Sequence, residues 1–167
     1  MTSKKKLVVA LISGILLILL YIAIFSFSGQ NGDTSGSLSM RVTRLGIDIW
    51  EGLTGEEFSQ SVREELASFF EHPLRKAAHF MEYAVMGILI YSLLYYYVKS
   101  NLRRYIYSVL WVFLSATLDE IHQYFVPGRW ASAADVLLDT CGGATGALLC
   151  FGIICLAASR KIKKIDE

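Results

Sequence analysis

The sequence predicts an all-α integral membrane protein, a bundle of four transmembrane helices with amphipathic helices in the long first outer loop. Of the 167 residues 54% are hydrophobic, and the mean hydropathy is +0.45. A helix needs roughly 20 apolar residues to cross a hydrocarbon core about 30 Å thick. Four stretches have this length, at residues 7–27, 77–98, 105–126 and 133–158. At this chain length we expect one domain over residues 1–167.

The first apolar stretch, Leu7 to Phe27, contains no charged residue. Lys4, Lys5 and Lys6 precede it, as they would in a secretory signal. However, the stretch is longer than the core of a signal peptide, and no A-x-A cleavage site follows it. We therefore expect an uncleaved membrane anchor.

Basic residues are distributed unevenly along the chain. Ten of the sixteen Lys and Arg lie at the N-terminus, between the second and third spans, or after the fourth span. An excess of Lys and Arg in short flanking segments marks the cytoplasmic side of a membrane protein. Both termini are therefore expected in the cytoplasm, and the loop at residues 28–76 is expected outside.

This outer loop contains two segments with apolar residues at helical spacing. Their apolar positions are Leu38, Val42, Leu45 and Ile49 in the first segment, and Phe58, Val62, Leu66 and Phe69 in the second. A capping box, Thr54-x-x-Glu57, precedes the second segment. The spacing predicts two amphipathic helices. Covering the top of the bundle and binding a partner both remain open as their role.

Polar residues gather at the predicted outer ends of all four spans. This polar layer consists of Ser28, Gln30, Lys76, His79, Glu82, Tyr83, Asp119, Glu120, Gln123, Arg129, Asp135 and Asp139. A charged side chain at a helix centre costs roughly 2.5 to 3.5 kcal/mol on insertion scales, so these residues should face the bundle interior. We expect His79, Glu82, Glu120 and Arg129 to form one connected polar cluster.

Other residues fit structural roles. Gly142 and Gly146 follow the same helical stripe as the polar layer and would allow a close helix approach. His122 points away from the polar face of its helix, and His72, before Pro73 in the loop, is expected at the surface. Interfacial or packing aromatics are expected at Tyr95, Tyr96, Tyr97, Trp111 and Trp130.

Four motifs of the polar layer resemble the VanZ-like family. They are FSGQ at 27–30, LRKAAHFMEYAVMG at 74–87, DEIHQYFVPGR at 119–129, and Asp135 with the glycines that follow it. Every residue of the layer except Asp139 matches the family pattern, and an Asn is common at that position. The resemblance implies a bacterial integral protein of the cell membrane. The family's named member is associated with low-level resistance to the glycopeptide antibiotic teicoplanin.

The favoured function is a binding protein for a membrane lipid, a lipid-linked envelope precursor or a lipoglycopeptide antibiotic. Lys76 and Arg129 would hold a phosphate or carboxylate, and the layer's carboxylates and Gln123 would meet amide or hydroxyl groups. Arg129 follows Pro127 and Gly128 in a short connection, where its removal should cost little packing. A structural interpretation competes, in which Lys76 snorkels to the headgroups and the polar side chains satisfy one another.

Two further functions remain open. An intramembrane hydrolase or transferase acting on a polyprenyl-linked envelope precursor would use His79 as acid or base, oriented by Glu82, and Glu120 as a second acid or base. A proton-linked transporter would use the carboxylates as a relay. GxSxG, HExxH and phosphate-binding glycine motifs are absent from the sequence. The three cysteines lack CxxC spacing, and His79 with Glu82 and Glu120 gives only one histidine, so we expect no metal and no other cofactor. The sequence also gives no reason to expect a nucleic-acid partner.

Overall fold

The computed structural model describes residues 3–166, with side chains at 3–31 and 36–156. The regular secondary structure of this part of the chain is entirely α-helical. The helices are α1 (Ser3–Ser28), α2 (Gly32–Thr54), α3 (Gln60–Tyr97), α4 (Asn101–Tyr124) and α5 (Ala133–Asp166). The predicted all-α class is therefore confirmed for the described residues.

Among the described residues, three helices are long and apolar enough to cross a membrane. They are α1, α3 and the Ala133–Leu156 part of α5. Helix α4, which corresponds to the predicted third span, does not meet this criterion, because it carries Arg103, Arg104, Asp119 and Glu120. The composition of the helices indicates a membrane protein with three clear spans.

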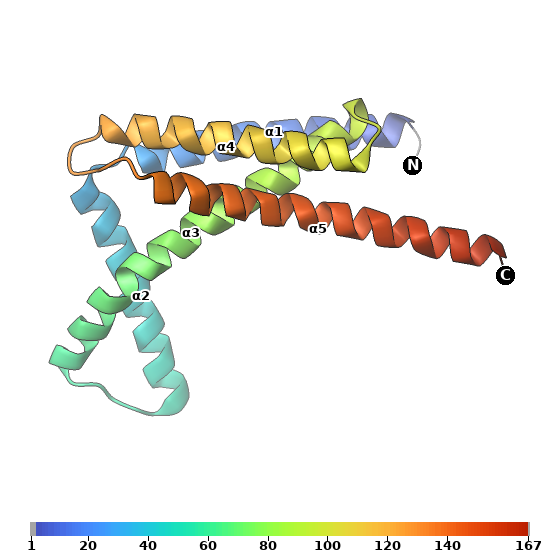
Figure 1. Cartoon of the computed structure of the whole chain (residues 1–167). Coiled ribbons are helices and arrows are strands. Elements are labelled where there is room, and N and C mark those ends of the chain that lie inside the picture. Colours follow the sequence, from blue (N-terminus) through green and yellow to red (C-terminus); the bar gives the residue numbers. More distant parts are fainter. Residues whose placement is uncertain (1–2, 167) are drawn as a thin grey trace.

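Helix α3 is the centre of the arrangement and packs against α1, α2, α4 and α5. Figure 1 shows α1, α4 and α5 lying roughly along a common axis, with α5 in the opposite chain direction and α3 crossing them obliquely. The start of α1, the end of α5 and the α3–α4 connection lie at one end, which we call the basic end. The α1–α2 and α4–α5 connections lie at the opposite end, the polar end.

Helix α3 joins the second predicted amphipathic segment to the second predicted span without a break. Its N-cap is Ser59, whose hydroxyl oxygen accepts a hydrogen bond from the Val62 amide at 3.4 Å. The predicted Thr54-x-x-Glu57 capping box is therefore wrong. Thr54 ends α2, because Gly55 adopts a left-handed conformation with φ of 73° that stops the helix.

Pro73 lies inside α3, so His72 belongs to a helix and not to the predicted loop. A residue before proline is usually excluded from helical conformation, which explains the wrong prediction. Its predicted surface position is confirmed, since the side chain is exposed.

Helices α3 and α5 approach each other backbone to backbone. A Cβ atom at Gly146 would lie 1.9 Å from the carbonyl oxygen of Ala84, and one at Gly142 would lie 2.3 Å from that of Phe80. Any larger residue would force the helices apart. The close approach predicted from these two glycines is confirmed, and it brings the polar residues of α5 against α3.

Helix α2 projects sideways from the polar end and packs on the N-terminal half of α3 (Figure 1). Arg63 of α3 forms ion pairs with Asp48 and Glu51 of α2. The apolar stripe predicted for α2 is largely exposed, at 46 to 57% of each side chain. Leu38 and Ser39, in the N-terminal third of α2, line a cavity together with residues of the bundle.

Candidate functional site

A buried hydrogen-bond network connects α1, α4 and the α4–α5 connection at the polar end. Asp119 is its centre: one carboxylate oxygen accepts from the hydroxyl of Ser28 at 2.9 Å and from the side-chain amide of Gln123 at 2.9 Å. These three residues are exposed by only 1 to 6%. The other carboxylate oxygen of Asp119 is buried without a hydrogen-bond partner among the described residues. The carboxylate therefore has unused capacity to accept a donor.

Arg129 extends this network to the end of α1. Its guanidinium donates to the side-chain oxygen of Gln123 at 3.1 Å, to the carbonyl of Gln30 at 3.0 Å and to the carbonyl of Phe27 at 3.1 Å. Gly128, with φ of 76°, provides the turn that directs Arg129 toward α1. Burial lowers the pKa of Arg129 from its ordinary value, but a guanidinium remains charged.

These contacts correct the expectation that Arg129 has little packing role. All three of its donor nitrogens already have partners, in α1, just after the end of α1, or in α4. The residue therefore fixes two chain segments in place, and its positive charge is held at the polar end.

Two more pairs of predicted site residues meet at the polar end. His79 Nδ1 lies 3.8 Å from a carboxylate oxygen of Glu82, beyond hydrogen-bond distance, and has no hydrogen-bond partner among the described residues. Lys76 of α3 forms an ion pair with Asp135 in the first turn of α5.

Two polar cavities, of about 150 and 260 Å³, open between these residues. They share Arg75, His79 and Arg129 as lining residues. The smaller also contacts Gln30 and Glu82. The larger cavity also contacts His72, Lys76, Gln123, Gly128, Trp130 and Asp135. Cationic side chains outnumber carboxylates around this space, so it favours an anionic group.

The structure brings three members of the expected polar cluster together and leaves the fourth apart. His79, Glu82 and Arg129 line one cavity. Glu120 lines neither polar cavity, and its carboxylate accepts from the backbone amide of Ser132 at 2.7 Å. This bond holds Ser132, directly before α5, against α4, and no hydrogen bond joins Glu120 to His79 among the described residues.

The remaining polar-layer residues occupy the interior. Tyr83 is completely buried in the apolar core, and Asp139 is 2% exposed with one carboxylate oxygen lacking a hydrogen-bond partner among the described residues. His122 stacks on Phe25 with ring centroids 4.1 Å apart, which confirms that it lies outside the network. No group of His, Cys, Asp and Glu side chains suited to a metal ion occurs within the described part of the chain.

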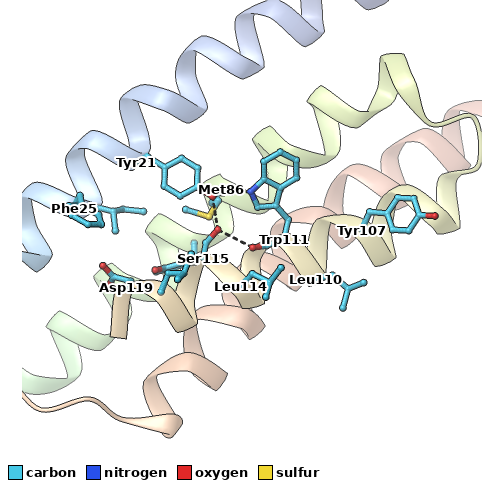
Figure 2. A pocket seen from close by; sticks show the side chains of 12 residues that line it. Tyr21, Phe25, Met86, Tyr107, Leu110, Trp111, Leu114, Ser115 and Asp119 are labelled. Carbon is cyan, nitrogen blue, oxygen red and sulfur yellow. Dashed lines mark hydrogen bonds between the residues drawn. The ribbon is translucent and has the colours of Figure 1, made fainter. Parts of the chain in front are cut away.

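An apolar groove of about 530 Å³ lies between α1 and α4 (Figure 2). Tyr83 and Met86, both 0% exposed, line it, while Leu114 and Leu118 of α4 are 60% and 65% exposed. The groove is thus open toward the surroundings of the helices. Asp119 also lines it, so the buried network reaches the groove.

Polar contacts of Tyr21 also connect the two helices along this groove. The Tyr21 hydroxyl and the Ser115 hydroxyl are 2.5 Å apart, and the Trp111 indole nitrogen donates to Tyr21 at 3.0 Å (Figure 2). The groove was not predicted from the sequence, where Trp111 was interpreted only as an interfacial or packing aromatic. The Tyr21 hydroxyl within the first span was the available signal, since a polar group at that depth needs a partner on another helix.

Arg75 is a second residue that the sequence analysis left out of the site. It lines both polar cavities, and its only ion pair in the described residues is a long contact of 3.6 Å with Glu71. Its position one residue before Lys76 was the signal, but that position also fits an anchor at a helix end.

The VanZ/LLP1 family profile matches residues 13–156, which include most of the chain and all the motifs of the polar layer. No curated protein and no solved structure matches the chain significantly. The chain belongs to the VanZ/LLP1 family.

Proposed function

We propose that this protein binds a lipid-linked anionic ligand at the outer face of a bacterial cell membrane. The observation that carries the proposal is the position of Asp119, which lines the apolar groove and is linked through Gln123 to Arg129. Arg129 in turn lines both polar cavities. One network therefore connects a groove suited to hydrocarbon with a space suited to an anion, and a lipid with an anionic head has both parts.

Arg75 and His79 are the residues through which the head would be held. Arg75 has only a long ion-pair contact, and the Nδ1 atom of His79 has no hydrogen-bond partner in the described chain. Both can therefore take a new partner without breaking a strong contact. Arg129 has partners at all three guanidinium nitrogens, so it acts on the head by its charge and by positioning the cavity.

The apolar groove would hold part of the hydrocarbon chain. Its volume of about 530 Å³ lies within the range of roughly 300 to 1,000 Å³ of small-molecule sites. Its exposed wall on α4 gives a lipid a lateral entrance from the bilayer, without passage through water.

In this proposal α4 is a fourth span. Its charged residues lie near its two ends, and residues 105–118 between them are uncharged. At 1.5 Å per residue, 24 residues give a helix of about 36 Å, enough to cross the hydrocarbon core. The buried side chains of Asp119 and Glu120 are shielded from lipid by the bundle. Both termini would lie in the cytoplasm, as the basic flanks favour.

The alternative that this geometry also favours is an enzyme acting on the same ligand. His79 and Glu82 line the cavity that contains Arg129, which places an acid–base candidate next to the anion site. A hydrolase or transferase would use His79 for proton transfer and Glu82 to orient it.

Binding of a long-chain polyprenyl monophosphate to the purified full chain in nanodiscs tests the proposal. We expect saturable binding of this probe. The matching polyprenol, which lacks the phosphate head, and glycerol phosphate, which lacks the hydrocarbon tail, should both bind much more weakly. Arg75→Ala should weaken binding at least about tenfold, the cost of one charge-assisted hydrogen bond. Arg41→Ala is the matched control, since this exposed arginine lies on α2, away from both cavities.

Equal binding of all three probes, or equal weakening by both substitutions, would contradict the proposal. Release of inorganic phosphate from the probe would favour the enzymatic alternative. The family resemblance also suggests a cellular assay. In a host where the protein confers teicoplanin resistance, Arg75→Ala should reduce resistance at unchanged protein abundance, and Arg41→Ala should not.

A further inference from the structure

Another cavity, of about 710 Å³, lies at the basic end of the bundle, opposite the candidate site. It forms where the start of α1 meets the end of α3 and the α3–α4 connection. Its lining residues are Ser3, Lys6, Tyr95, Tyr96, Tyr97, Val98, Lys99 and Arg104. Three of them are cationic and none is acidic, so the cavity has an uncompensated positive charge.

Arg104 is the most deeply buried cation of this cavity. The residue is 3% exposed, and no carboxylate of the described residues lies within ion-pair distance of it. One terminal nitrogen donates to the Lys99 carbonyl at 3.4 Å and to the side-chain oxygen of Asn101. Its Nε and Nη1 atoms are buried and have no hydrogen-bond partner among the residues whose side chains are described. A buried charge without a counter-ion is costly, and a bound anion would remove much of that cost.

Aromatic rings and a helix terminus support the same conclusion. The Arg104 guanidinium lies 4.5 Å from the ring centroid of Tyr95, and the Lys6 ammonium lies 4.8 Å from it on the α1 side. These contacts stabilise two cations without neutralising them. Helix α4 begins at Asn101, beside the cavity, and the positive end of its dipole favours an anion there.

We propose that this cavity binds the phosphate group of an anionic phospholipid of the inner leaflet. The apolar surface beside it favours a lipid over a free anion. Leu7, Val8 and Leu11, which follow Lys6 along α1, are 39 to 58% exposed and would lie along the acyl chains. Basic pockets between membrane helices on the cytoplasmic side commonly bind anionic headgroups. The site uses none of the residues of the polar end, so its binding does not depend on the proposed function; only its assignment to the inner leaflet rests on the same orientation.

Native mass spectrometry of the purified full chain, titrated with phosphatidylglycerol or phosphatidylcholine, tests this site. We expect phosphatidylglycerol to bind more tightly. Lys99→Gln and Arg104→Gln should each weaken its binding about fivefold, the contribution of one cation near an anionic headgroup. Lys99 is exposed and its side chain forms no hydrogen bond or ion pair in the described chain, so this variant should fold even if Arg104→Gln does not.

Arg103→Gln is the matched control, because Arg103 is the exposed neighbour of Arg104 and does not line the cavity. Equal binding by the Lys99 variant and this control would overturn the site. Displacement of phosphatidylglycerol by inorganic phosphate at similar concentration would overturn the assignment to a lipid. Arg75→Ala, which tests the polar end, should leave this binding unchanged, so failure of one proposal can be distinguished from failure of the other.

Discussion

The buried cationic side chains at the two ends of the bundle differ in whether they have partners within the protein. At the polar end, Arg129 has three protein hydrogen bonds and Lys76 is paired with Asp135. At the basic end, Arg104 is more deeply buried but has no acidic partner among the described residues. Internal pairing makes the polar end a preformed structure whose charges are fixed before any ligand binds. The basic end instead has a buried cation without an acidic partner in the described part of the chain, which is the basis for proposing a lipid phosphate there.

Among the substitutions that test this difference, Arg129→Ala should change the unfolding free energy most. It removes a charged donor from three acceptors at once, so we expect a loss of about 3 kcal/mol or more in unfolding free energy. Thermal and denaturant unfolding in detergent would measure it. Arg104→Met at the other end is the contrasting variant. In the absence of anionic lipid, Arg104→Met should leave the unfolding free energy unchanged or raise it. It removes a buried charge that has no acidic partner in the described chain. Equal destabilisation by both would show that the two ends do not differ.

Ser28→Ala should have an intermediate effect. The Ser28 hydroxyl donates to the buried Asp119 carboxylate, and a hydrogen bond to a charged group contributes about 1.5 to 3 kcal/mol. Unfolding in detergent should show a loss in this range. Ser26→Ala is a suitable control, since the exposed Ser26 hydroxyl bonds only to a carbonyl of its own helix. A loss no greater than that of the control would mean that Asp119 does not depend on α1.

The smallest effect is expected at the Lys76–Asp135 pair. Both side chains remain about a quarter exposed, at 29% and 26%, and pairs at such positions contribute about 1 kcal/mol or less. A double-mutant cycle with Lys76→Gln and Asp135→Asn would measure the coupling. A coupling energy above about 2 kcal/mol would indicate that this pair is shielded from water, and that the polar end is more closed than its cavities suggest.

Some features of the site were predictable because they depend on position along a helix. His79 and Glu82 are three residues apart, so any helix over that segment places them on one face, and the structure shows them as a pair. The glycine stripe was predictable for the same reason, since Gly142 and Gly146 are one turn apart.

Other features depend on which side chain reaches a partner from another segment. Glu120 follows Asp119 directly, yet Asp119 contacts α1 and Glu120 contacts Ser132. Periodicity cannot show that difference, because it depends on how the bundle is assembled. Arg129 illustrates the same limit, since its bonds to α1 join residues about one hundred positions apart in the chain.

The sequence by itself determined the helical class, three of the four predicted apolar spans and the family, because these depend on composition, length and local motifs. Only the structure decided that α3 runs unbroken through Pro73, that a groove beside Asp119 lies between α1 and α4, and that Arg104 is buried with no acidic partner among the described residues. The physical reason is that each of these depends on contacts between distant segments. A residue's type fixes what it can bind, but the packing of helices decides which partners come within reach and which groups remain unpaired.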